Sequence, residues 1–163
     1  MEVLPDEWKG EPIVILNDSV FITVSTVNDE NRILYSTISY IFVNKRNPTL
    51  LERMVFSEDM SFESTPVIEV TALYPDGSQW KSRLSDFTTE PYLYSGQYKT
   101  NHLIHTFTFP RYVKGMLIRL SVNKEFVAPT HYSHEPIRDR YPILQKTVCF
   151  TYPKGYTINQ RES

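Results

Sequence analysis

The sequence predicts an all-β fold, and three observations indicate it. β-branched residues, 13 Val, 12 Ile and 15 Thr, outnumber the helix formers Ala and Leu, at 2 and 12, by 40 to 14. Another 11 Tyr and 9 Phe add to the residue types that strands favour. Several segments alternate apolar and polar residues with the period of two of a half-buried strand. Together they predict an antiparallel β-sandwich or partly open barrel of about eight or more strands, with at most one short helix.

The length and composition are typical of one ordinary globular unit. The chain has 163 residues, of which 40% are hydrophobic and 22% are charged. Domains have about 150 residues, so residues 1–163 are expected to form one β-sandwich-like domain. The charge content is too low, and the hydrophobic content too high, for a chain that stays disordered.

Strands in the first half of the chain are predicted in order. Residues 12–16 form a short apolar segment, which is expected to be an edge strand that could pair with another chain or with a following domain. Residues 20–25 alternate, and the polar cluster at 28–31 then predicts a turn. Residues 33–45 are expected to form a long strand that is partly buried on both faces, with Tyr35, Thr37, Ser39, Ile41 and Val43 on one face and Leu34, Ile38, Tyr40 and Phe42 on the other. Residues 49–56 are the single helix candidate, since Leu and Met recur there at mixed spacing.

The second half continues the pattern. Residues 67–74 alternate and end at Pro75-Asp76-Gly77, a turn signal that predicts a hairpin with residues 79–83. Residues 103–109 place His105, Phe107 and Phe109 on one side before Pro110 ends the ladder. A strand around Ile118, Leu120 and Val122 follows, and residues 141–152 close the fold, with Leu144, Val148, Phe150 and Tyr152 facing one way.

Composition and charge exclude or disfavour several functions. A net charge of −2 gives no basic footprint, so nucleic acid is not an expected partner. No run of 18 apolar residues occurs, so no membrane span is predicted, and the first residues have no basic and apolar leader. The single cysteine, Cys149, cannot form an internal disulfide, so it does not identify a redox compartment.

The order of several turn and core motifs resembles a known family. The motifs occur along the chain as Leu4-Pro-x-x-Trp8, the strand Pro12 to Leu16, the turns Ala72-Leu-Tyr-Pro-Asp-Gly77 and Phe109-Pro-Arg-Tyr-Val-Lys-Gly115, Tyr141-Pro-Ile, and Phe150-Thr-Tyr-Pro153. In this order they resemble the N-terminal β domain of uncharacterised function found in bacterial transglutaminase-like proteins, many of them from Bacteroidetes, over residues 7–156.

This resemblance implies a role without chemistry of its own. The family places such a β domain before a papain-like transglutaminase core, usually in the periplasm or outside the cell. The expected partner is that following domain or another protein, and no catalytic residue or cofactor is expected here. A transglutaminase site needs a Cys thiolate with His and Asp partners, usually at a helix N-terminus. Cys149 lies instead within a predicted strand, where a buried structural role is expected.

The histidines do not predict a metal site. His102 and His105 are three apart on a strand, so their side chains should point to opposite faces. His131, His134 and Glu135 lie in a Pro-bounded loop where shared coordination is geometrically possible, but solvated loop histidines are much commoner. No metal or cofactor is therefore expected.

A tyrosine-rich segment offers an alternative function. Tyr92, Tyr94 and Tyr98 lie in what reads as a connection between strands, and loop tyrosines can form flat recognition surfaces for sugars or peptides. The chain could then be a carbohydrate- or peptide-binding β-sandwich. The simpler interpretation is that these rings cover an open end of the core.

Overall fold

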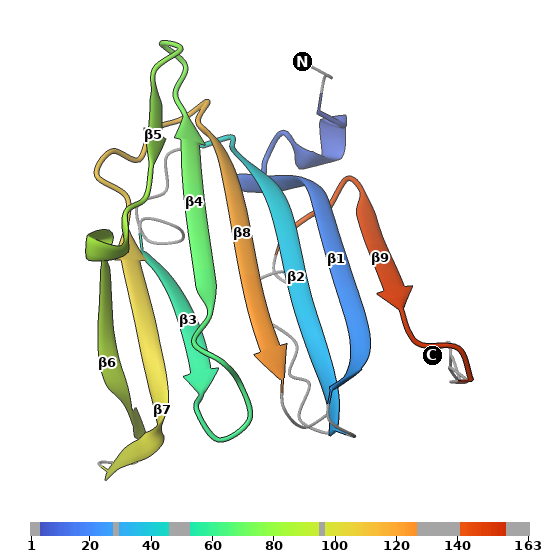
Figure 1. Ribbon diagram of the computed structural model, residues 1–163. Helices are drawn as coiled ribbons and strands as arrows, with labels where there is room; N and C mark the ends of the chain where they lie inside the picture. The colour runs from blue at the N-terminus through green and yellow to red at the C-terminus, as the bar shows by residue number, and fades with distance from the viewer. Residues whose placement is uncertain (1–3, 28–29, 46–52, 95–96, 127–140, 156–163) are drawn as a thin grey trace.

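The computed structural model describes residues 4–27, 30–45, 53–94, 97–126 and 141–155. Nine strands and two single-turn 3-10 helices make up this part of the chain, and no longer helix occurs within it (Figure 1). The elements are η1 (Asp6–Trp8), β1 (Ile13–Val27), β2 (Glu30–Val43), β3 (Arg53–Asp59), β4 (Val67–Leu73), β5 (Gln79–Lys81), η2 (Leu84–Asp86), β6 (Phe87–Tyr94), β7 (Gln97–Thr108), β8 (Leu117–Phe126) and β9 (Lys146–Thr151).

The strands form two separate sheets, which confirms the predicted all-β class. One sheet has six strands in the order β5-β4-β8-β2-β1-β9, and the other has three in the order β3-β7-β6. Neither sheet closes into a barrel within the described residues. The main core lies between them, because Met54, Phe56 and Phe107 of the small sheet share one buried cluster with Val70 and Ile118 of the large one.

Alternation along β2 shows which face of the large sheet is buried. Tyr35, Thr37, Ser39, Ile41 and Val43 are buried, and the residues between them are half-buried or exposed, so the period of two is confirmed and one face is more fully enclosed than the sequence indicated. A second, smaller cluster forms farther along the same face, beyond the main core. It consists of Val20, Ile22, Ile33, Tyr35 and Phe126.

Residues 12–16 do not form a separate edge strand, so that prediction is wrong. Residues 13–15 are the first part of the long β1, and Ile13 and Ile15 pair with Val43 and Ile41 of β2. Ile15 also bridges to Ile143 on the other side. A bulge between Ile15 and Asn17 joins this part to the rest of β1, and the pattern of residues 12–16 alone gave no sign of that continuity.

The edge of the large sheet beside β1 belongs instead to β9. It pairs with β1 in parallel, from Asp18 opposite Lys146 to Thr23 opposite Thr151. The other strand pairs are antiparallel, as expected for this fold class.

The predicted helix over residues 49–56 is wrong where the structure describes it, because residues 53–56 belong to β3. Met54 and Phe56 are buried while Val55 between them is 39% exposed, which is the alternation of a strand. β3 pairs with β7 from Arg53 opposite Thr108 to Asp59 opposite His102. Only Met54, Val55 and Phe56 alternate in burial before the polar residues 57–59. This stretch is too short for the period of two of a strand to be recognised in the sequence.

Two turns that are distant in the sequence meet at one end of the large sheet. Gly77 ends the β4–β5 turn and Gly115 precedes β8, and both have positive φ, 81° and 83°. A Cβ on Gly115 would lie 3.0 Å from Cγ of Pro75, whereas nothing lies within 4 Å of the same position on Gly77. Glycine is therefore required at position 115 for two reasons: the backbone there is left-handed, and a Cβ would come too close to Pro75 of the other turn.

Replacing Gly115 by Ala is expected to cost more stability than the same change at Gly77. The left-handed conformation alone costs a residue with a Cβ roughly 1–2 kcal/mol, and the Pro75 contact adds to it only at Gly115. Gly10→Ala, where φ is not positive and nothing lies within 4 Å, should change little. Urea denaturation of the three variants measures their free energies of unfolding. Equal losses of stability at Gly115 and Gly77 would contradict the role of the Pro75 contact.

Candidate functional site

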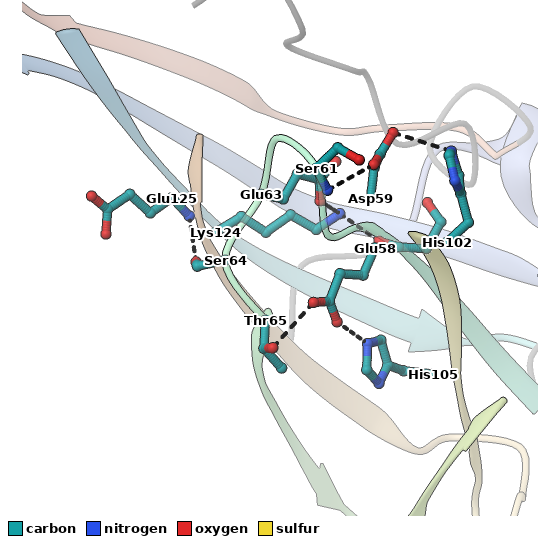
Figure 2. A network of polar contacts seen from close by, with 11 residues as sticks. Glu58, Asp59, Ser61, Glu63, Ser64, Thr65, His102, His105, Lys124 and Glu125 are labelled. Atoms are coloured by element: carbon teal, nitrogen blue, oxygen red, sulfur yellow. Dashed lines mark hydrogen bonds and ion pairs between the residues drawn. The ribbon is translucent and has the colours of Figure 1, made fainter. Parts of the chain in front are cut away.

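Polar contacts concentrate where the turn after β3 meets β7 and β8 (Figure 2). The residues come from four parts of the chain: the end of β3 (Glu58 and Asp59), the turn after it (Ser61, Glu63, Ser64 and Thr65), β7 (His102 and His105) and β8 (Lys124 and Glu125). Glu58 and Lys124 are each 2% exposed and His105 is 7% exposed, so charge-bearing groups lie inside the protein here. This buried polar cluster is the candidate functional site.

His105 connects a carboxylate and a hydroxyl. Its Nε2 lies 2.7 Å from Oε2 of Glu58, and its Nδ1 lies 2.9 Å from Oγ1 of Thr89. The other Glu58 oxygen accepts a hydrogen bond of 3.1 Å from Thr65. Strand register explains the first contacts, because Thr89 lies directly opposite His105 on β6 and His105 lies opposite Phe56, two residues before Glu58.

A hydroxyl, an imidazole and a carboxylate in a row are the groups that nucleophilic catalysis uses. Here, however, the imidazole and the carboxylate are almost wholly enclosed, and Thr65 also binds the carboxylate. The contacts join the turn at residues 60–66 to β3, β6 and β7. Their burial favours a structural role, in which the polar groups satisfy one another.

Lys124 places its ammonium group in the same buried region. Nζ donates a hydrogen bond of 2.8 Å to the carbonyl oxygen of Ser57 and lies 3.1 Å from Oε2 of Glu63. The side chains of Lys124 and Glu63 are 2% and 7% exposed. The pair therefore connects β8 to β3 and to the turn across the interior, where a lysine is rarely found without a partner.

His102 takes a different partner from His105. Its Nε2 lies 3.1 Å from Oδ2 of Asp59, and the two side chains are 30% and 23% exposed. Asp59 also accepts a hydrogen bond of 3.0 Å from the backbone N–H of Ser61. The two histidines thus contact separate carboxylates, as their spacing predicts.

No group of three or more His, Cys, Asp or Glu residues that could hold a metal ion occurs among the residues that the structure describes. His131, His134 and Glu135 lie outside those residues. Within the described ranges there is also no helix long and apolar enough to cross a membrane.

The tyrosine-rich segment is a hairpin and not a loop, so that part of the prediction is wrong. Tyr92 and Tyr94 belong to β6 and Tyr98 to β7, with Tyr92 opposite Lys99 and Tyr94 opposite Gln97. The side chain of Tyr92 is 36% exposed, whereas those of Tyr94 and Tyr98 lie outside the described part. Ligand binding by the three tyrosines stays a prediction.

Cys149 is exposed on β9, which corrects the expectation of a buried residue. Its neighbours Val148 and Phe150 are also exposed, because β9 is the last strand of the large sheet and none of its residues belongs to either buried cluster. The prediction that Cys149 lies within a strand is confirmed. The sequence could not show that this last strand lies outside the core.

A second polar contact joins the two turns of the sequence resemblance. Nη1 of Arg111 lies 2.8 Å from Oδ2 of Asp76, and the guanidinium lies 5.0 Å from the centre of the Tyr74 ring. The pKa of Asp76 is held well below its usual value, chiefly by the hydroxyl of Ser78 and then by hydrogen bonds from Arg111 and the Ser78 backbone. Burial raises the pKa of Tyr74 despite the nearby Arg111.

Asp76→Asn is expected to reduce stability near neutral pH more than in acid. Because the folded-state pKa of Asp76 is depressed, the unfolded chain takes up the proton first, so the contribution is full above about pH 4 and is lost as the pH falls toward the folded-state pKa. Thermal unfolding of both proteins at pH 6, 4, 3 and 2 should show the difference narrowing in acid. A difference that stays constant over this range would contradict the assignment.

The fold and the cluster define a two-sheet β protein with a buried polar junction. No protein-family model matches the chain, and no curated protein matches it. Among solved structures, it is similar to a protein described as a putative protease from Parabacteroides distasonis ATCC 8503, with a TM-score of 0.64 and 13% sequence identity. The match covers 88% of this chain and 29% of that protein, so the chain spans less than a third of its structural neighbour. At this identity the likeness establishes the fold alone.

Proposed function

We propose that this chain is a non-catalytic accessory or interaction module of a larger transglutaminase-like protein, related to the papain-like cysteine peptidases. The observation that carries the proposal is the coverage of the structural match. The match covers 88% of this chain but only 29% of a protein described as a putative protease. An architecture that recurs as one part of a longer chain is typical of a module whose chemistry, if any, is performed by other parts.

The placement of the reactive groups supports the same proposal. Cys149 lies on an exposed edge strand, without the helix N-terminus that lowers the pKa of a catalytic thiol. The described histidines, His102 and His105, lie on β7 in the other sheet and contact Asp59 and Glu58. The groups of a Cys–His–Asp site are therefore on different sheets among the described residues.

The proposed partner is a transglutaminase-like domain of the same polypeptide or a separate protein. The resemblance to the bacterial family further implies a periplasmic or extracellular location. Neither the module nor its partner surface needs a cofactor in this proposal.

The test compares this chain with the longest reading frame that contains it. Both are expressed and assayed for amidase, peptidase and acyl-transfer activity on a panel of glutamine-containing peptides. Activity confined to the longer protein is expected. Activity of the 163-residue chain alone, lost in Cys149→Ala, would overturn the proposal, and Ser78→Ala provides a control variant at an exposed site far from Cys149.

A further inference from the structure

Among the residues that the structure describes, β9 forms an open edge of the large sheet. It is the last strand in the order β5-β4-β8-β2-β1-β9, and Figure 1 shows it at the right-hand border of the sheet. All six of its residues are exposed. An exposed edge strand presents unpaired N–H and C=O groups to any strand that can align with it, and proteins usually protect such edges with charges, prolines or bulges.

The backbone groups at this edge can be assigned from the β1 pairing. The N–H of Asp18 donates a hydrogen bond of 2.9 Å to the carbonyl of Gln145, so residue 145 directs its backbone groups toward β1. Backbone direction alternates along a strand, and the parallel register continues without a shift from Lys146 to Thr151. Lys146, Val148 and Phe150 therefore direct their N–H and C=O groups toward the open edge.

The side chains along β9 offer little protection. Val148 and Phe150 are 47% and 51% exposed, and Leu144 and Tyr152 beside them are 43% and 46% exposed. Val148 and Phe150 lie on the same face as the buried Val20 and Ile22 opposite them. Lys146 is the only charged residue of β9, and it stands at the first position.

The sequence of this strand is self-complementary. Residues 147–151 read Thr-Val-Cys-Phe-Thr, so an antiparallel copy centred on Cys149 sets Val148 against Phe150 and Thr147 against Thr151. Apolar and Thr–Thr cross-strand pairs stabilise a sheet. The same register separates the two Lys146 side chains to opposite ends of the ribbon, opposite Tyr152, whereas a shift by two residues toward Lys146 would set that charge against Phe150.

We propose that β9 is the docking site for β9 of a second copy of this chain, paired antiparallel with the two Cys149 residues opposite each other. The two six-stranded sheets then form one continuous sheet through a two-fold axis. The outward groups of Val148 and Phe150 form the hydrogen-bonded pairs. Cys149 falls at a pair without hydrogen bonds, where the Cα atoms are about 4.5 Å apart, within the range that a disulfide spans.

A ribbon of two six-residue strands buries less than the roughly 1,200 Å² of a standard stable interface, so the dimer is expected to be weak and concentration-dependent. Sedimentation equilibrium of the 163-residue chain under reducing conditions should show reversible association. Val148→Pro removes an outward N–H without removing a bond to β1, and it should abolish association with little change in the folded monomer. Val67→Lys, at an exposed position of β4 in the same sheet, is the control and should associate normally.

Disulfide trapping tests the register independently. Diamide accepts two protons and two electrons from two Cys149 thiols, and the native chain should give a covalent dimer at a rate well above that of Cys149→Ser/Ser78→Cys, whose exposed thiol reports random collisions. Cys149→Ser/Thr147→Cys/Thr151→Cys should also be trapped, because those two positions are opposite each other. Cys149→Ser/Thr147→Cys, which lacks a cysteine at position 151, should form a covalent dimer no faster than the collision control.

Three results would overturn the proposal. They are trapping of Cys149 no faster than the collision control, association that survives both Val148→Pro and Phe150→Lys, and a dimer crosslinked equally well by Thr147→Cys alone. Capture of β9 by a strand of a different protein would overturn it as well. Each result concerns association only, so failure here leaves the activity comparison under the proposed function unaffected.

Discussion

Replacing Lys124 by Met is expected to lower the free energy of unfolding by about 3–5 kcal/mol, because it leaves a buried carboxylate without its cation. Nζ of Lys124 contacts both the Ser57 carbonyl and Glu63, and the two side chains are 2% and 7% exposed. Met keeps most of the apolar stem of the lysine, so little cavity forms. The loss of stability therefore comes mainly from removing the charge and its hydrogen bonds. Urea denaturation followed by circular dichroism measures it.

A matched ion pair on the surface provides the control. Lys81 lies 3.3 Å from Glu69, with the two side chains 62% and 45% exposed. Lys81→Met should change stability by less than about 1 kcal/mol, since exposed pairs are weak. The double variant Lys124→Met/Glu63→Gln should recover part of the loss, because the uncompensated charge is removed. Equal effects at Lys124 and Lys81 would contradict the buried location of the pair.

Replacing Phe107 by Ala is expected to cost about 3–5 kcal/mol, the usual range for removing a buried aromatic side chain. Phe107 has no exposed surface and lies between the two sheets. Its ring centre lies 5.3 Å from Trp80, 5.2 Å from Phe87 and 4.9 Å from Phe109, so one truncation weakens three aromatic contacts. Thermal or urea unfolding would measure the loss.

The control for Phe107 is an exposed apolar residue of the same protein. Val67 on β4 is 61% exposed, and Val67→Ala should stay within about 0.5 kcal/mol of the native chain. A second variant, Phe107→Leu, refills much of the volume and should lose less than Phe107→Ala. If the Ala variant unfolded no more easily than Val67→Ala, the core assignment between the two sheets would be wrong.

The strands that the sequence predicted well are those with one buried and one exposed face. Alternation along β4, β7 and β8 grouped onto one face the residues that are buried, including Val70, Phe107 and Ile118. Along β2 it separated the two faces correctly but did not show which of them is buried. Pro75-Asp76-Gly77 correctly predicted the β4–β5 hairpin. In these segments the local pattern and the tertiary environment agree, because each strand meets the core on one side only.

The strands that the sequence missed lack such a pattern or depend on distant partners. β3 was mistaken for a helix because its buried Met54 and Phe56 follow Leu50 and Leu51, so that apolar residues recur at mixed spacing. The end of β6 and the start of β7 were read as a connection because Pro91 and polar residues interrupt the alternation there. Pro91 is tolerated at a register shift on β6, an edge strand where a missing N–H is cheapest.

The buried polar cluster could not have been found in the sequence. Glu58 and Asp59 look like an ordinary acidic surface pair, and nothing in the sequence around Lys124 indicates which carboxylate it contacts. Only the register of β3 against β7 brings Glu58 to His105, and only the turn at residues 60–66 brings Glu63 to Lys124. A lysine in line with Ile118, Leu120 and Val122 was the one available signal.

The sequence by itself determined the all-β class, most strand positions and the β4–β5 turn, because these depend on local propensity and on a period of two. The tertiary structure alone decided which strand became an edge, which charges were buried and where Cys149 lies. These depend on contacts between residues far apart in the chain, such as β9 with β1, and no local pattern encodes them. The exposed edge and the buried cluster are therefore properties of the assembled fold.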